Sequence, residues 1–261
     1  MSWDRFQSGE RWLAEAAYSW LRQRYGVSAV KVFDEISPKI PWRPSLHLKA
    51  NSYTLVAAEV SEERPYPDIL AQRMNEIVRF QAPVSVYCVC PAEEFLKRSR
   101  QGEVGNLKRD GIGLLTVDRD GSVTRQHQCI PLVQHIPERE FLDAVHPIPK
   151  RNVRVQLQDA YDTYLTDPVS GNRAAADILE ELINDAARKA ARKQIISNNS
   201  ARKRIAELLD DMYWCEEFKH SRPGIAAARS YVAEYRNTFS HAPKSSKQAY
   251  KKYNRCKDGF K

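Results

Sequence analysis

The chain of 261 residues has no apolar run of membrane-spanning length, and its first residues, MSWDRFQSGERWL, contain neither a basic start nor a signal-like apolar stretch. We therefore expect a soluble, cytoplasmic protein without a membrane partner. Cysteine is scarce, and its five residues are scattered and odd in number, which argues against a disulfide framework. An apolar fraction of 42%, with 12 tyrosines and 5 tryptophans, is nevertheless enough to fill real cores.

Two of the cysteines, Cys88 and Cys90 in VYCVCP, lie two positions apart on a predicted strand and so share one face of it. A zinc site would need two further thiol or imidazole ligands at suitable spacing, and the sequence offers no convincing pair. We expect both thiols to pack in a core and expect no cofactor.

The positive charge is distributed unevenly along the chain. Residues 1–149 carry 19 basic and 19 acidic side chains, whereas residues 150–261 carry 22 and 14, so the whole net charge of +8 falls in the second part. This asymmetry indicates that the second part meets a polyanion, most simply a nucleic acid. A solvated basic face on a helical domain would give the same balance.

The apolar pattern of the first part alternates between helical and strand-like periods, which predicts an α/β sandwich over residues 1–145. A boundary is expected around residues 144–159, where two prolines and a basic cluster end the strand-like pattern. The predicted helices are 10–25, 66–80 and 92–111, and the predicted strands fall within 28–36, 45–50, 53–61, 83–91 and 112–126, the last holding an Asp-Gly turn between two strands.

The pattern beyond the boundary is helical throughout, which makes the whole chain a two-domain α+β protein with an all-α second domain over residues 155–261. Apolar residues recur there at steps of three and four. The predicted helices are 173–196, 201–219 and 225–241, followed by a basic helix in SSKQAYKKYNRCKDGF at the end of the chain.

The element order of the first domain, with the stretch RPSLHLKANSYTLVAAEVSEE, resembles the PD-(D/E)XK restriction-endonuclease-like fold over residues 8–125. In that family a Pro-Asp pair and a Glu-x-Lys motif hold a divalent metal. Here Ser45 follows Pro44 where the Asp belongs, Glu59 matches the glutamate, and Ser61 replaces the lysine. A serine hydroxyl is a poor ligand for a hard cation and cannot supply the charge of lysine. The resemblance therefore implies a degenerate nuclease-like domain used for sensing or docking.

A metal-dependent DNase built on Glu59 stays open as an alternative. Glu15 on the first helix, or Asp34 and Glu35 on the first strand, would then replace the missing acidic ligands. The neutral charge balance of the first domain fits a docking role, with a protein or ligand as the trigger, better than it fits tight DNA binding.

A short polar motif lies near the end of the last predicted amphipathic helix before Pro243. Arg236 and Asn237 are followed by His241, and this R-x4-H spacing in an all-α domain resembles the HEPN superfamily, many of whose members are ribonucleases. Asn237 and His241 are four residues apart on one helix face, and Arg236 lies on the same turn. A position in the last helical turn favours the imidazolium form of His241.

The resemblance implies metal-independent cleavage of RNA at a homodimer interface, where two copies of the motif form one basic cleft. His241 suits proton transfer from the 2′-hydroxyl, Arg236 suits the charge on the phosphorane, and Asn237 suits holding either His241 or a phosphate oxygen. Such an enzyme is a toxin-like or anti-phage effector, with the first domain controlling cleavage. Some HEPN domains bind without cutting, so a nucleic-acid-binding or dimerisation scaffold stays open as well.

The final basic helix supplies candidate contacts to the RNA backbone, with Tyr250 and Tyr253 as stacking residues. A solvated helix face would show the same composition. The predicted nucleic-acid-binding residues are Lys244, Lys247, Lys251, Lys252 and Arg255, with Lys257 nearby.

Overall fold

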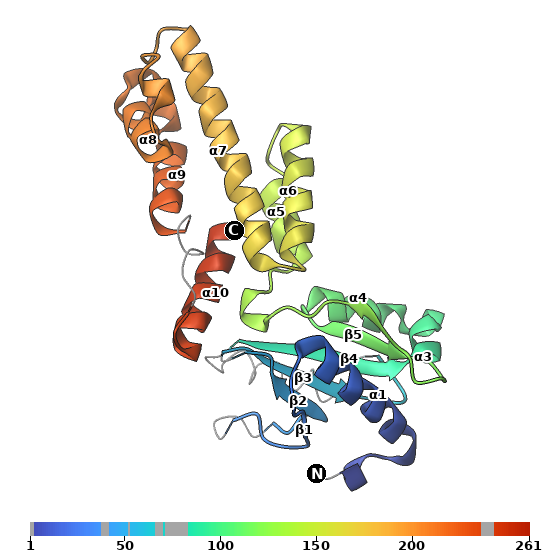
Figure 1. Ribbon diagram of the computed structural model, residues 1–261. Coiled ribbons are helices and arrows are strands. Elements are labelled where there is room, and N and C mark those ends of the chain that lie inside the picture. Colours follow the sequence, from blue (N-terminus) through green and yellow to red (C-terminus); the bar gives the residue numbers. More distant parts are fainter. Residues whose placement is uncertain (1–2, 38–41, 52, 66–69, 71–82, 236–242) are drawn as a thin grey trace. The chain divides into compact units, whose positions relative to one another are not determined.

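The computed structural model describes residues 3–37, 42–51, 53–65, 70, 83–235 and 243–261. The chain forms two compact units, and Figure 1 labels most of their elements. Unit 1 comprises Met1–Glu140 and Pro243–Asn254, and unit 2 comprises Phe141–Ala242 and Arg255–Lys261. The last helix, α10 (Ser246–Phe260), contributes residues to both units.

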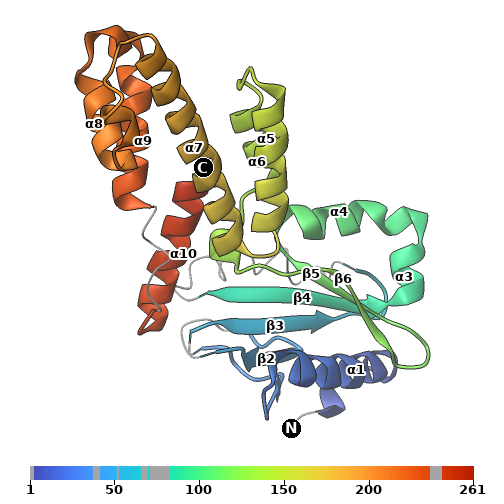
Figure 2. The same cartoon turned by 45° about the horizontal axis from the view of Figure 1, so that its top comes forward.

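Unit 1 is built on a sheet that has six strands within the described residues, arranged in their order along the chain. The central pairs β3–β4 and β4–β5 are parallel, whereas β1–β2, β2–β3 and β5–β6 are antiparallel. The arrows of β3 and β4 accordingly point the same way in Figure 2. The strands are β1 (Lys31–Val32), β2 (Leu46–Lys49), β3 (Leu55–Val60), β4 (Val84–Pro91), β5 (Gly113–Val117) and β6 (Val123–His127).

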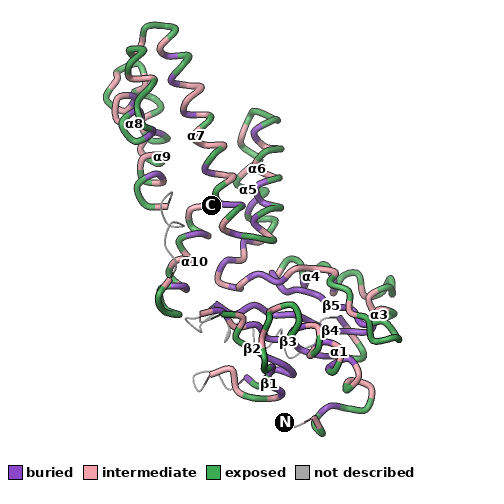
Figure 3. The backbone as a smooth tube through the Cα atoms, viewed as in Figure 1, coloured by how far each residue is buried: buried purple, intermediate pink, exposed green. Residues whose placement is uncertain are grey.

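Helices cover both faces of the sheet. Successive side chains of the central strands point to opposite faces, and they pack into two separate apolar cores. On one face Tyr87 and Val89 of β4 pack with Leu13 and Leu21 of α1 (Ser8–Tyr25). The opposite face is covered by α4 (Gln101–Arg109), whose Val104 and Leu107 pack with the cysteines and valines of β4. Every residue of β4 is buried, and the tube of Figure 3 is correspondingly purple there. The mixed α/β class expected from the sequence is confirmed.

Local signals account for several element boundaries. The side chain of Gln7 accepts from the backbone of Glu10 while Glu10 reaches back to Gln7, which closes the first turn of α1. At its other end Gly26 adopts φ 62°, the left-handed conformation that glycine tolerates best. The Asp-Gly turn between β5 and β6 holds Gly121 at φ 84°. The predicted helix at 92–111 is divided into α3 (Ala92–Leu96), a 3-10 turn (Arg98–Arg100) and α4, and the one predicted at 66–80 lies almost wholly outside the described residues.

The described residues of unit 2 form α-helices, 3-10 turns and the segments that join them, with no strand among them. Its main core joins Ile183 and Ala187 of one helix to Leu208, Leu209 and other apolar residues of the next two. The helices are α5 (Glu138–Val145), α6 (Arg151–Tyr164), α7 (Pro168–Arg192), α8 (Ile205–Trp214), α9 (Arg222–Glu234) and the end of α10, with 3-10 turns at Ser200–Arg202 and Glu216–Ser221.

Helix α8 is shorter than the predicted 201–219. Arg204 before it and Cys215 after it both take extended backbone angles, with ψ 150° and 130°, so the flanking residues form 3-10 turns instead. Asp167 caps α7 by accepting hydrogen bonds from the backbone of Val169 and Ser170. No helix in the described part of the chain is both long and apolar enough to cross a membrane.

Candidate nucleic-acid interface

The predicted catalytic residues Arg236, Asn237 and His241 lie outside the described residues. The described chain reaches Tyr235, the C-cap of α9, and resumes at Pro243, just before α10. Among the described elements, α10 is the helix that follows the motif, and its side chains bear on nucleic-acid binding.

The N-terminus of α10 is fixed by side-chain hydrogen bonds. The Ser245 hydroxyl accepts from the backbone N–H of Gln248 at 3.2 Å, and the Gln248 side chain accepts from the backbone N–H of Lys244 at 2.8 Å. The bond to Ser245 satisfies a donor, the Gln248 N–H, that the first turn of a helix leaves unpaired. Ala249 and Cys256, seven residues apart, are fully buried and define the inner face of the helix. That inner face determines which lysines point outward.

Three predicted contact residues, Lys247, Lys251 and Arg255, form a single row along the outer face of α10. All three are exposed, and their spacing of four residues places successive side chains about 6 Å apart along the helix axis. None of them forms an ion pair with another described residue. We call these three residues the cation row. Lys244, also exposed, precedes the row, and the exposed carboxylate of Asp258 follows it.

The other predicted contacts on α10 lie differently. Lys252 lies about 100° around the helix from Lys251. At that position it is half-buried, and it interacts with another residue. Tyr250 and Tyr253 are also half-buried. The structure therefore brings together Lys247, Lys251 and Arg255 but separates Lys252 from them.

Some cations of unit 2 are paired with carboxylates, whereas others, such as Lys189, Arg192 and Lys193 near the end of α7, are exposed and form no ion pair with another described residue. Lys203 Nζ lies 2.7 Å from Asp211 Oδ2, and Lys219 Nζ lies 3.1 Å from Glu216 Oε1. Arg188 likewise pairs with Asp185 on α7. These paired side chains have less positive charge to offer a phosphate than the cation row does.

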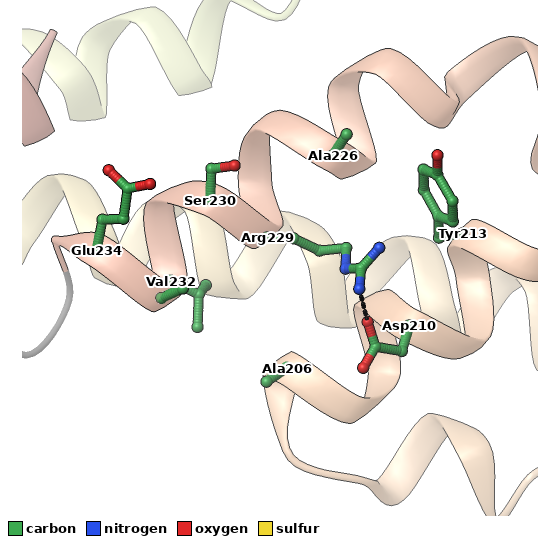
Figure 4. Close-up of a pocket in the computed structure, with 9 residues that line it drawn as sticks. Ala206, Asp210, Tyr213, Ala226, Arg229, Ser230, Val232 and Glu234 are labelled. Atoms are coloured by element: carbon green, nitrogen blue, oxygen red, sulfur yellow. Dashed lines mark ion pairs between the residues drawn. The ribbon is translucent and has the colours of Figure 1, made fainter.

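A groove of about 470 Å³ lies between α8 and α9 and is shown in Figure 4. At its centre the Arg229 guanidinium lies 2.6 Å from Asp210 and 5.0 Å from the centre of the Tyr213 ring. Glu234 adds a second carboxylate to the lining. With two carboxylates against one guanidinium, the groove has no net positive charge for a phosphate.

Unit 1 holds the candidate metal ligand, Glu59, in a buried hydrogen-bond network. Its carboxylate accepts hydrogen bonds from Trp42 Nε1 at 2.7 Å, Ser45 Oγ at 2.8 Å and the Ser45 backbone N–H at 3.0 Å. Ser45 Oγ in turn accepts from the backbone N–H of Val60. Glu59 is only 5% exposed, and burial raises its pKa. Both carboxylate oxygens are thus occupied by protein donors, which fits a structural role better than metal binding.

The acidic residues considered as replacement ligands are engaged elsewhere, each with a basic neighbour. Glu15 pairs with Arg11 at 3.0 Å, Asp34 with Lys31 at 2.6 Å, and Glu35 with Arg43 at 2.6 Å. Within the described residues, no group of three or more histidine, cysteine or acidic side chains is arranged to hold a metal ion.

The thiols of β4 pack in the core as predicted, since Cys88 and Cys90 are both fully buried on one face of the strand. Burial raises the pKa of Cys90 to about 12, and that of Cys88 lies well above its ordinary value. Neither thiol is therefore poised as a nucleophile at neutral pH.

Sequence reasoning missed Trp42 as the partner of Glu59. The residue lies 17 positions before Glu59 in a proline-rich stretch, where no local periodicity marks it. Its indole is 1% exposed, and the only sequence signal was the presence of a large aromatic residue beside two prolines.

Comparison with known proteins gives no assignment: no family model matches the chain, and neither the curated proteins nor the solved structures contain a significant match.

Proposed function

We propose that the protein is a metal-independent endoribonuclease of the HEPN type, with RNA bound along α10. The cation row is the observation that supports RNA binding, because three exposed cations, none of them paired with another described residue, follow one another along a helix that begins soon after the R-x4-H motif. A single strand presents phosphates at a comparable spacing, and charge neutralisation of this kind dominates binding to nucleic acids.

The chemistry assigned to the motif needs three groups. His241 takes the proton of a 2′-hydroxyl, whose oxygen attacks the adjacent phosphorus while the bond from phosphorus to the 5′-oxygen breaks. The departing oxygen takes a proton, and the products end in a 2′,3′-cyclic phosphate and a 5′-hydroxyl. Arg236 offers its planar fork to the phosphorane oxygens, and Asn237 orients His241 or a phosphate oxygen. Two copies of the chain, joined through the helical domain as a homodimer, would supply paired motifs.

The first domain fits a regulatory part in this proposal. Trp42 and Ser45 occupy the carboxylate of Glu59, and this favours a degenerate nuclease-like domain over an active one. A protein or ligand trigger acting on the first domain would control cleavage, as in a toxin-like or anti-phage defence effector. A metal-dependent DNase is accordingly the weaker alternative, and it predicts a strict need for Mg²⁺ or Mn²⁺.

The test is incubation of purified protein with labelled RNA in excess EDTA. Wild-type protein is expected to produce 2′,3′-cyclic phosphate ends, and His241→Ala and Arg236→Ala are each expected to lose about 10²–10⁴-fold in rate while keeping fold and dimer. Cleavage retained by both variants would refute the assignment. Cleavage that appears only on restoring the metal, and is indifferent to His241→Ala, would move the active site to the first domain.

A non-catalytic RNA-binding scaffold is the second candidate, and the cation row supports it equally. It predicts RNA binding that weakens with salt, with no product accumulating over time. Cleavage in EDTA that depends on His241 distinguishes the two.

A further inference from the structure

Helix α7 separates its charged residues by sign along its length. Residues 177–185, DILEELIND, contain four carboxylates and no basic residue, whereas residues 188–193, RKAARK, contain four basic residues and no carboxylate. The helix dipole favours acidic residues in the first turn and basic residues in the last turn. The first turn of α7 has no acidic residue, and the acidic segment lies in the middle of the helix. The dipole therefore accounts for the basic end but not for the acidic segment.

Four of these residues, Asp177, Glu181, Arg188 and Arg192, form one strip along α7. All four are exposed. Their steps of four, seven and four residues keep them within about 60° of the helix circumference, over about 22 Å of its axis. The buried residues of the same stretch lie on the opposite side of the helix. We call these four residues the charged strip.

Neighbours within the charged strip carry the same sign. Asp177 and Glu181 are four residues apart, as are Arg188 and Arg192, and like charges at this spacing destabilise an isolated helix. Of the four, only Arg188 forms an ion pair with another described residue, the partly exposed Asp185 of the same helix. Such a surface pair contributes little to stability and is readily exchanged. The charged strip thus carries charge that its own helix does not neutralise.

The order of the signs makes the charged strip complementary to a second copy of itself. Asp177 and Arg192 are equally far along the chain from the midpoint between positions 184 and 185, and the same holds for Glu181 and Arg188. A two-fold axis through that midpoint would relate two antiparallel α7 helices. Asp177 would then face the partner's Arg192. Glu181 would face the partner's Arg188, and the symmetry gives each contact twice.

A groove of about 340 Å³ borders the acidic half of the charged strip. It is lined by Asp177, Glu180, Glu181, Asn184, Arg188 and Ala201. Three carboxylates against one guanidinium give this groove a net negative charge. An arginine side chain fits such a surface, because its planar fork pairs with carboxylates through two parallel hydrogen bonds. The partner's Arg192, facing Asp177, would supply that arginine.

We infer that the charged strip is the surface through which two copies of the chain pair, with their α7 helices antiparallel. This pairing rests on the homodimer of the proposed function, but it does not depend on RNA cleavage. One helix pair covers less area than a permanent interface does. The dimer is therefore expected to be reversible and to weaken as salt is added.

The experiment reverses the sign of each half of the charged strip in the full chain. Arg188→Glu with Arg192→Glu makes the strip wholly acidic, and Asp177→Lys with Glu181→Lys makes it wholly basic. For each variant alone, sedimentation at about 0.1 M salt should show a dimer dissociation constant at least about a hundredfold above that of the wild type, because every opposite-charge contact becomes a like-charge contact.

An equimolar mixture of the two variants provides the rescue. The acidic strip of one chain then faces the basic strip of the other, so all four contacts are again between opposite charges. We expect the heterodimer to form with an affinity within about tenfold of the wild-type dimer. Failure of the mixture to associate, with both variants folded by circular dichroism, would overturn the pairing.

A matched control changes the same charge on the same helix but away from the charged strip. Lys189 and Lys193 each lie about 100° around α7 from Arg188 and Arg192, respectively. The double variant Lys189→Glu, Lys193→Glu should therefore keep the dimer affinity within about fivefold of the wild type. A loss as large as that of the wholly acidic variant would show that net charge, rather than the charged strip, governs association, and would overturn the pairing.

The wild-type chain gives a readout that needs no variant. Raising the salt from about 0.1 M to about 0.5 M should weaken its dimer about tenfold or more. A chain that is monomeric at about 100 μM, or a dimer indifferent to salt, would overturn the pairing. So would a wholly acidic variant that keeps the dimer and loses only RNA affinity, because α7 would then bind a polyanion instead.

RNA cleavage in EDTA, measured on the same samples, separates this pairing from the proposed function. Cleavage together with unchanged dimers in the reversed variants would keep the ribonuclease and overturn the pairing. The expected dimer behaviour without any cleavage would support the pairing while the proposed function fails.

Discussion

Glu59 in unit 1 and the cation row on α10 are two sets of charged groups with opposite surroundings. The Glu59 carboxylate is buried and accepts three hydrogen bonds, whereas Lys247, Lys251 and Arg255 are exposed and unpaired within the described chain. A buried carboxylate whose acceptors are filled stabilises the fold and has little capacity left for a ligand. Unpaired surface cations add little to the fold, but they can release counterions when a polyanion binds. Glu59 is thus a charge that supports the fold, whereas the cation row consists of charges that are available to bind a polyanion.

The largest effect is expected where the buried charge is altered. Glu59→Gln replaces one carboxylate oxygen by an N–H₂ group, which must face a donor from either Trp42 or Ser45. We expect the free energy of unfolding to fall by about 3 kcal/mol, measured by chemical denaturation. The control is Glu15→Gln, which removes an exposed carboxylate paired with Arg11 and should cost at most about 1 kcal/mol. Equal losses in the two variants would contradict the structural role of Glu59.

Neutralising the whole cation row should have the next largest effect. In the triple variant Lys247→Gln, Lys251→Gln, Arg255→Gln, we expect the slope of log K against log salt for single-stranded RNA to decrease in magnitude by about 2. Between 1 M and 0.1 M salt, the affinity of the variant for RNA should therefore rise about a hundredfold less than that of the wild type. The free energy of unfolding of the variant should stay within about 1 kcal/mol of the wild-type value.

The control for the row removes a paired cation. Lys219→Gln eliminates one exposed lysine of unit 2 that already lies 3.1 Å from Glu216, so RNA binding should change little. If Lys219→Gln weakened binding as much as Lys251→Gln alone, general charge rather than the row would govern RNA binding.

A smaller effect should appear as a pH dependence at a second buried polar group of unit 1. His47 on β2 is buried, its Nδ1 has no hydrogen-bond partner among the described residues, and burial, followed by the charge of Lys31, lowers its pKa. The group therefore contributes stability that is present above the unfolded-state pKa of about 6.5 and is lost as the pH falls through the folded-state pKa.

We expect unfolding of the wild type to be more acid-sensitive than that of His47→Gln, by up to about 1.4 kcal/mol for each pH unit within that window. Denaturation curves at pH 7 and pH 5 measure the difference. The exposed His146 provides the control, because His146→Gln should keep the pH dependence of the wild type. An identical dependence in wild type and His47→Gln would contradict the prediction.

Much of the fold was accessible to sequence reasoning because it follows local periodicity. The strands β2 to β6 and the helices α1, α7, α9 and α10 all overlap predicted elements. Boundaries were less accurate where backbone angles at single residues decide, as at Cys215, which ends α8 early. The sequence predicted Lys251 and Lys252 alike as contacts, and it could not tell that Lys251 is exposed while Lys252 is half-buried. The buried face of a helix depends on what packs against it.

The sequence by itself determined the concentration of positive charge in the second part, the mixed α/β first part, the helical second part and the R-x4-H spacing of Arg236 and His241. These depend on composition and on neighbours within a few turns. Only the tertiary structure decided that Trp42 satisfies Glu59, because the two residues are distant in sequence. Such pairings arise from the packing of whole elements, and a local pattern carries no information about them.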